Sequence, residues 1–241
     1  MKVETRFVVL AAARSGSTAL TTTLNTHPDI YCHGSPFFRG KKNQLALLDE
    51  VQNGLDLSKL ETDPGGYMYD ILNFTPGPKC VGLKAWPGQI RSSLRAISLM
   101  TKDPSIKKIV LNRKNHLACL SSFELVRLKQ SARHLFADGL PRPQIDFDRE
   151  AFLEYVETRS WLFNWYDKKC KHGYLEIPYE GLMTDGIYKI VEHLGLDPIT
   201  FKARTTKRNT SDVLGRYKPE FHNEIVECLD EIGHPEWVTE K

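Results

Sequence analysis

A short segment near the N-terminus combines residue types that could bind an anion. Arg14 carries a fixed positive charge. The hydroxyl groups of Ser15, Ser17 and Thr18 are hydrogen-bond donors, and Gly16 lets a backbone approach a ligand closely. If a helix begins here, its first backbone N–H groups and its dipole also attract negative charge. The segment therefore predicts an anion site, and the alternative is a helix start capped by Ser15 or Ser17 without a ligand.

A second pair of candidate anion ligands lies near the middle of the chain. Arg113 follows the apolar run 109–111, and Ser121 comes eight residues after it. A guanidinium group can donate two parallel hydrogen bonds to phosphate oxygens. A helix that starts near Asn115 would place Ser121 about two turns from its beginning. Taken alone, a surface arginine and a helical serine without a ligand are the simpler interpretation.

Alternating strands and helices must position these residues. The apolar run 7–13 is continuous and has β-branched residues at its start, which is typical of a strand buried on both faces. The other expected strands are 80–84, 107–111 and 174–177, and the expected helices are 18–25, 43–51, 90–100, 115–135, 148–171, 188–194 and 220–232. This alternation predicts an α/β fold of three layers, in which helices cover both faces of a central parallel sheet.

The chain shows no internal repeat and no change of composition that would mark a linker, so we expect one domain over residues 1–241. Residues 34–79 contain many glycines and prolines and are expected to form a loop-rich insertion. Long loops with aromatic side chains often build binding sites over an α/β scaffold. The aromatic residues of the insertion are Phe37, Phe38, Tyr67, Tyr69 and Phe74.

Composition excludes several other classes of protein. Of the 241 residues, 41% are hydrophobic and 26% are charged, which excludes a disordered or low-complexity chain. A net charge of +3 gives no argument for a nucleic-acid partner. The five cysteines form no CxxC pair, so we expect reduced thiols in a cytoplasmic protein and no metal site. The run 7–13 is at the short limit for a signal peptide and Glu4 interrupts its basic flank, so a strand is the preferred interpretation. No apolar run is long enough for a transmembrane helix, and no membrane partner is expected.

Three segments together resemble the sulfotransferases that use 3′-phosphoadenosine 5′-phosphosulfate (PAPS). The Walker A and GxGxxG patterns of other nucleotide-binding loops are absent. The first segment is similar to the family's 5′-phosphosulfate loop, the second to its 3′-phosphate site, and the third to a motif near the adenine. They are Arg14-Ser15-Gly16-Ser17-Thr18-Ala19-Leu20, Arg113 with Ser121, and Ile177-Pro178-Tyr179-Glu180-Gly181-Leu182 followed by His193-Leu194-Gly195-Leu196. The resemblance covers residues 7–196 and implies a P-loop nucleotide-hydrolase-like fold.

The resemblance also implies a role for each matched residue. Arg14 would stabilise the leaving 5′-phosphate, and Arg113 and Ser121 would hold the 3′-phosphate that distinguishes PAPS from ATP. Tyr179 would lie near the adenine. The remaining ligands of the 5′-phosphate would be Ser15, Gly16, Ser17, Thr18 and Ala19. The product would be 3′-phosphoadenosine 5′-phosphate (PAP), and the reaction would need no metal.

Basic residues are concentrated in two segments. Residues 107–133 contain seven lysines or arginines and one acidic residue, and residues 202–218 contain six and one. Family members close the nucleotide with a basic loop near the C-terminus, for which Lys207 and Arg208 are the candidates. A solvated basic face is the alternative explanation.

The general base is where the chain departs from the family. Cytosolic members carry a histidine in a Lys-Thr-His run at a strand end, and here the run is Lys84-Ala85-Trp86. His33 is the nearest residue able to accept a proton near neutral pH and is the candidate base, although a lone histidine is more often structural. The expected acceptor is a small molecule or carbohydrate with a hydroxyl or amine. The residues expected to contact it are His33, Phe37, Trp86 and Phe123, unless these belong to the core.

Two other functions stay open at this point. A P-loop small-molecule kinase would need Gly-Lys in the loop and an acidic residue after strand 107–111, and the sequence has neither. A non-catalytic family member that binds a nucleotide would explain the missing histidine. The presence of Arg14, Arg113 and Ser121 argues against this second alternative.

Overall fold

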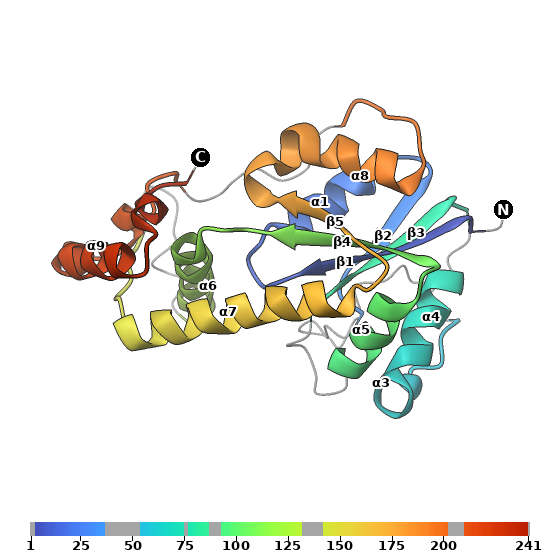
Figure 1. Cartoon of the computed structure of the whole chain (residues 1–241), viewed down its shortest axis with the longest axis horizontal. Coiled ribbons are helices and arrows are strands. Elements are labelled where there is room, and N and C mark those ends of the chain that lie inside the picture. The colour runs from blue at the N-terminus through green and yellow to red at the C-terminus, as the bar shows by residue number, and fades with distance from the viewer. Residues whose placement is uncertain are drawn as a thin grey trace. The chain divides into compact units, whose positions relative to one another are not determined.

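The apolar run near the N-terminus forms β1 (Thr5–Ala11), the middle strand of a five-stranded sheet. Phe7, Val8, Val9 and Leu10 are completely buried, because a middle strand is covered on both faces. The strand order is β2-β3-β1-β4-β5, and every neighbouring pair is parallel (Figure 1). The other strands are β2 (Ile30–His33), β3 (Cys80–Ala85), β4 (Ile106–Asn112) and β5 (Leu175–Pro178).

The computed structural model describes residues 3–36, 54–74, 77–86, 93–131, 142–201 and 210–240. Within these ranges, no helix has both the length and the apolar character needed to cross a membrane. The helix expected at 43–51 and the aromatic residues Phe37 and Phe38 lie outside them. The chain divides into two compact units. Unit 1 comprises Met1–Asn112 and Phe163–Thr206, and unit 2 comprises Arg113–Leu162 and Lys207–Lys241. The prediction of one domain over residues 1–241 stays a prediction.

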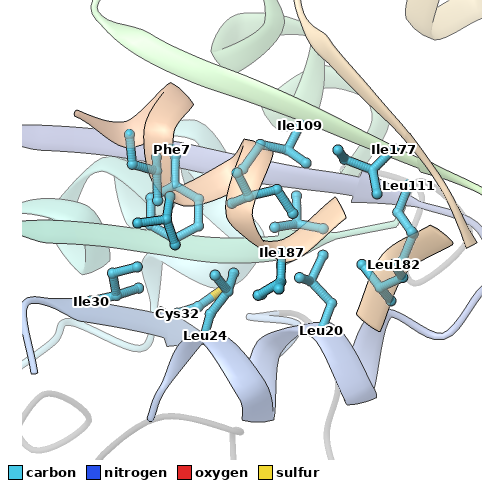
Figure 2. Packing of buried hydrophobic residues seen from close by; sticks show 14 of the residues in the cluster. Phe7, Leu20, Leu24, Ile30, Cys32, Ile109, Leu111, Ile177, Leu182 and Ile187 are labelled. Carbon is cyan, nitrogen blue, oxygen red and sulfur yellow. The ribbon is translucent and has the colours of Figure 1, made fainter. Parts of the chain in front are cut away.

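Helices cover both faces of the sheet in unit 1. They are α1 (Ser17–Leu24), α3 (Lys59–Thr62), α4 (Pro64–Phe74), α5 (Ser93–Lys102), the short η2 (Tyr179–Gly181) and η3 (Leu182–Gly186), and α8 (Ile187–Leu194). Figure 1 shows α1 and α8 on one face and α4 and α5 on the other. On the first face, Phe7 and Ile109 of the sheet pack with Leu20, Leu24 and Ile187 of the helices (Figure 2). The predicted three-layer α/β fold is confirmed.

Three elements of unit 1, β2, α3 and α4, are not among the helices and strands predicted from the sequence. α4 begins at Pro64, a residue favoured in the first turn of a helix, and buries Tyr67 and Met68 completely. The loop prediction is therefore wrong for residues 64–74, and Tyr67 is a core residue. Two glycines directly after the proline conceal the helical spacing of the apolar residues. The strand β2 is missed because its four residues are too few to show a pattern.

Unit 2 has a hydrophobic core of its own. It contains α6 (His116–Ser131), the first part of α7 (Arg149–Lys169), α9 (His222–Glu231), and the short helices η4 (Leu214–Arg216), η5 (Pro219–Phe221) and η6 (Pro235–Val238). Leu117 of α6, Phe152 of α7 and Ile225 of α9 belong to one buried cluster. Val213 lies beside η6, since its N–H donates to the Val238 carbonyl oxygen at 3.0 Å.

All five cysteines are buried, three in unit 1 and two in unit 2. Burial raises the pKa of Cys32 to about 12 and that of Cys170 to about 11. It also raises the pKa of Cys80 and of Cys228. These four thiols are therefore protonated at neutral pH.

Gly82 of β3 is the register partner of Phe7 in β1. A Cβ atom at residue 82 would overlap the Phe7 ring, so the ring occupies the space that a side chain on β3 would need. Glycine at residue 82 is therefore a packing requirement of the central strands.

We expect Gly82→Ala to lower the free energy of unfolding by about 1–3 kcal/mol, the usual range for an overpacked core. Gly181→Ala is the matched control, because a Cβ atom there meets nothing within 4 Å and its φ of −110° suits alanine. The control also measures the effect of replacing a glycine on the unfolded chain. Urea unfolding checks the difference, and equal midpoints for the two variants would contradict the packing argument.

His33 in unit 1 and His116 in unit 2 are buried histidines whose pKa is lowered. Burial lowers the pKa of His33 in β2 to about 4 and that of His116 in α6 to about 3. An unfolded chain has histidine pKa values of about 6.5. Between these limits the unfolded state binds more protons than the folded state. The stabilisation is therefore complete above the unfolded pKa and is lost as the pH falls towards the folded pKa.

We expect each of these histidines to lower the free energy of unfolding of its unit by about 1.4 kcal/mol per pH unit between about pH 6 and pH 4. His33→Gln and His116→Gln should each remove the contribution of one histidine to the pH dependence of the free energy of unfolding. The exposed His172 gives the control variant His172→Gln. Urea titrations at several pH values measure the slopes. If neither buried histidine changes the slope, the assignment of acid sensitivity to them is wrong.

Candidate functional site

The loop between β1 and α1 has an unusual backbone. Arg14 has a φ of +64° and is the one residue other than glycine with positive φ among those the structure describes. Gly16 follows with a φ of +85°. A non-glycine residue in this region costs about 1–3 kcal/mol and persists only where the surroundings enforce it. Left-handed residues of this kind turn backbone N–H groups into a concave site that suits an anion.

Gly16, at the start of α1, offers no side chain to the first N–H groups of the helix. Gly16 is the N-cap residue and makes no side-chain capping bond, and the first turn carries no acidic residue. The N–H groups of a first helical turn have no partner within the helix. The positive end of the helix dipole points the same way.

Two of the predicted hydroxyl ligands already have partners in the loop. Ser15 is completely buried, and its hydroxyl donates to the Ala12 carbonyl oxygen at 2.8 Å. This bond fastens the turn after β1. Thr18 is exposed on α1, and its hydroxyl accepts a hydrogen bond from Lys84 Nζ at 3.4 Å. Ser17 and Ala19 are half-buried beside it.

Lys84 is a site residue that the sequence analysis misses. It lies near the end of β3, next to β1 in the sheet, and points its ammonium group at Thr18. Burial lowers the pKa of Lys84, and the positive charge of Arg14 lowers it further, whereas Cys32 raises it. Two cations therefore act on each other beside the start of α1. A lysine within an otherwise apolar strand is the signal that could have identified it.

Tyr179 completes this part of the site. Its ring lies directly on Gly16, because a Cβ atom at residue 16 would be 2.5 Å from Tyr179 Cε2. Residue 16 must therefore be glycine both for its positive φ and for lack of space. Tyr179 directly follows β5, the edge strand that is separated from β1 by β4, and its side chain covers the loop after β1. Its predicted position near an adenine stays a prediction.

His33 lies at the same edge of the sheet as the loop. It is the last residue of β2 and pairs in register with Leu83 of β3, one residue before Lys84. Parallel strands all end at one edge, so His33, Lys84 and the loop share it. The His33 ring is 1% exposed and contacts Tyr31 edge-on at 4.5 Å. Trp86 directly follows β3 and is half-buried.

Unit 2 holds the other predicted anion ligands, Arg113 and Ser121, and buries both. Arg113 donates through Nε and Nη2 to the two carboxylate oxygens of Glu240, at 2.5 and 2.6 Å. Ser121 Oγ accepts from Arg216 Nη1 at 2.9 Å and donates to the Ala118 carbonyl oxygen at 3.2 Å. The simpler interpretation of a surface arginine is therefore wrong. Arg216 and Glu240 belong to this cluster and are missed by the sequence analysis.

The predicted acceptor residues are described only in part. Phe123 of α6 is 37% exposed, and its predicted contact with an acceptor stays a prediction. Phe37, Lys207 and Arg208 lie outside the described residues. No group of three or more His, Cys, Asp or Glu side chains in the described ranges could hold a metal ion.

The sequence matches no protein-family model and no curated protein. Solved structures are similar to this chain in fold. A sulfotransferase from Alicyclobacillus acidocaldarius has 16% identity and a TM-score of 0.50, with 97% of this chain and 98% of that chain covered. The sulfotransferase STF9 from Mycobacterium avium has 18% identity and a TM-score of 0.48, with 97% and 78% covered. The sulfotransferase domain of the Synechococcus PCC 7002 olefin synthase has 16% identity and a TM-score of 0.46, with 99% and 87% covered.

At these identities the similarity concerns the fold, and the first of the three structures carries it. The resemblance found in the sequence motifs and the similarity of the structure point to the same family of folds, although they rest on different observations. The chain therefore has the α/β fold of the Alicyclobacillus acidocaldarius sulfotransferase.

Proposed function

We propose that this protein is a sulfotransferase that transfers a sulfuryl group from PAPS to a hydroxyl or amine of a small-molecule or carbohydrate acceptor. The observation that carries the proposal is the start of α1, where a left-handed loop, an uncapped first turn and the cations Arg14 and Lys84 come together. Such a site suits the 5′-phosphate of a nucleotide. The shared fold and the order of the three motifs support the choice of PAPS as the nucleotide.

The chemistry asks mainly for positioning and charge stabilisation. As the acceptor oxygen or nitrogen bonds to sulfur, the bond from sulfur to the bridging oxygen of the 5′-phosphate breaks. By analogy with phosphoryl transfer, the transition state is loose and negative charge grows on the leaving phosphate. In the proposal, Arg14, Lys84 and the N–H groups of α1 stabilise that charge, and the product PAP leaves.

The acceptor must also lose a proton, and His33 is the candidate base. Its pKa of about 4 keeps the ring neutral at physiological pH, which is the state that can accept a proton. Because the ring is 1% exposed, an acceptor reaches it only when the side chains around it move. This burial favours one second candidate function, a family member that binds the nucleotide without transferring sulfate.

The nucleotide specificity can be tested by thermal shift. We expect PAP to raise the melting temperature of the full chain more than ATP with magnesium does, since the proposal gives the 3′-phosphate ligands of its own in unit 2, Arg113 and Ser121. Arg14→Gln should weaken PAP binding roughly tenfold, or about 1.4 kcal/mol, because a charged ligand of the 5′-phosphate is lost. The exposed Arg95 of α5 provides the control variant Arg95→Gln. Stronger stabilisation by ATP would overturn the proposal in favour of a kinase.

The transfer reaction can be tested with radiolabelled PAPS and a panel of phenols, alcohols, amines and sugars. We expect at least one acceptor class to be labelled, and we expect His33→Gln to lower kcat by about 10²–10⁴, the usual contribution of a general base. The acid limb of the kcat profile should lie near pH 4, where His33 gains its proton. His172→Gln, which changes an exposed histidine, is the control.

Each result separates two possibilities. An unchanged kcat for His33→Gln would remove His33 from the mechanism and leave the transferase proposal standing. PAP binding without transfer to any acceptor would favour the non-catalytic family member instead.

A further inference from the structure

Two buried arginines and one buried carboxylate form a single cluster in unit 2. Arg113, Arg216 and Glu240 are 5%, 6% and 3% exposed. Glu240 accepts two hydrogen bonds from Arg113, and its Oε2 lies 3.9 Å from Arg216 Nη2. Ser121 joins the cluster through its hydrogen bond from Arg216.

Among the residues that the structure describes, this cluster holds two guanidinium groups and one carboxylate. Burying a charge is costly unless a partner of opposite sign compensates for it. Burial lowers the pKa of Arg216, and the neighbouring Arg113 lowers it further, while Glu240 raises it. Asp212 also raises it, but that residue is exposed and its carboxylate accepts from the Gly215 N–H at 2.8 Å.

One N–H donor of Arg216 is not used in a hydrogen bond to any residue that the structure describes. Its Nη1 donates to Ser121 Oγ at 2.9 Å and to the Ala118 carbonyl oxygen at 3.3 Å, and its Nη2 donates to the Thr210 carbonyl oxygen at 2.5 Å. Its Nε is buried and meets no hydrogen-bond acceptor within the ranges that the structure describes. A buried donor without a partner is unfavourable, and a further acceptor oxygen would satisfy it. A phosphomonoester brings three acceptor oxygens and a charge of about −1.5 to −2, which would balance two arginines.

Glu240 is held in place by hydrogen bonds to the backbone of residues 237–240. Asn115 Nδ2 donates to the carbonyl oxygens of Trp237 and Thr239, each at 2.9 Å. The Glu240 N–H donates to the Ser211 carbonyl oxygen at 2.8 Å. A few hydrogen bonds therefore position a carboxylate on Arg113 in the paired geometry in which arginine also binds two phosphate oxygens.

We propose that Arg216 is a third ligand of the phosphate that Arg113 and Ser121 bind, and that Glu240 is an internal anion which this phosphate displaces. The inference rests on the proposed function, because that function supplies the ligand, the 3′-phosphate of PAPS or PAP. In the state described here the site is closed by the chain's own carboxylate. Nucleotide binding then requires residues 237–240 to release Arg113.

The test compares two nucleotides on the full chain by isothermal titration calorimetry. PAP carries a 3′-phosphate, and adenosine 5′-monophosphate does not. We expect Glu240→Gln to tighten PAP binding on the order of tenfold, because the competing charge is lost, and to leave the affinity for adenosine 5′-monophosphate unchanged. Arg216→Met should weaken PAP binding on the order of tenfold and should leave the affinity for adenosine 5′-monophosphate unchanged. Glu236→Gln, at an exposed glutamate of η6, is the matched control.

A second measurement uses the unmodified protein and so does not depend on how well Glu240→Gln folds. The Glu240 amide proton should exchange slowly in the free protein, because it is bonded to Ser211. Saturating PAP should speed its exchange at least severalfold, and adenosine 5′-monophosphate should not.

The outcomes distinguish the inference from the proposed function. If PAP binds tightly but neither its affinity for Glu240→Gln nor the exchange of the Glu240 amide changes, the displacement is wrong and the proposed function stands. If PAP binding is unaffected by Arg216→Met, Arg216 is not a ligand. If PAP binds no better than adenosine 5′-monophosphate to any variant, both the inference and the choice of donor are wrong.

Discussion

The turn from β1 into α1 is the constraint on which the rest of the candidate site depends. It must leave a fully buried strand, pass through two residues with positive φ, and begin a helix within a few residues. Tyr179 lies on Gly16 and Ser15 bonds to Ala12, so the turn is held from outside and from within. The strain at Arg14 persists because these contacts enforce it, and the turn brings Arg14 and the start of α1 together with Lys84.

Both units contain cationic side chains that are partly or fully buried. Lys84 in unit 1 and Arg113 and Arg216 in unit 2 have each lost part of their hydration. Burying a charge is unfavourable unless a partner of opposite sign compensates for it. In unit 2 the partner is Glu240, whereas Cys32 beside Lys84 is protonated at neutral pH and carries no charge. Such positions are expected where a protein holds binding energy ready for an anionic ligand.

The sequence predicts the parts of this structure that depend on local patterns. The strand 7–13, the loop after it and the helix that follows are neighbours along the chain, so residue types and spacing suffice to find them. The alternation of strands and helices likewise predicts the parallel sheet. β2 is not predicted because its four residues are too few to show a period. α4 is not predicted because two glycines lie near its start.

Contacts between distant residues could not be found in this way. Arg113 and Ser121 are suggested by their spacing, but Glu240 lies 127 residues beyond Arg113, and no local pattern links the two. Lys84 becomes a site residue only because β3 lies beside β1 in the sheet. Burial also had to come from the structure, since nothing in the sequence distinguishes His33 from an exposed histidine.

The buried cysteines give the molecule a set of internal reporters. A thiol reacts through its thiolate, so Cys32 and Cys80 of unit 1 and Cys228 of unit 2, with pKa values raised by burial, react slowly while their units stay closed. Each becomes accessible to an alkylating reagent only when its own surroundings open. The rate at which each cysteine is labelled therefore records the opening of its own unit, without any residue being added to the chain.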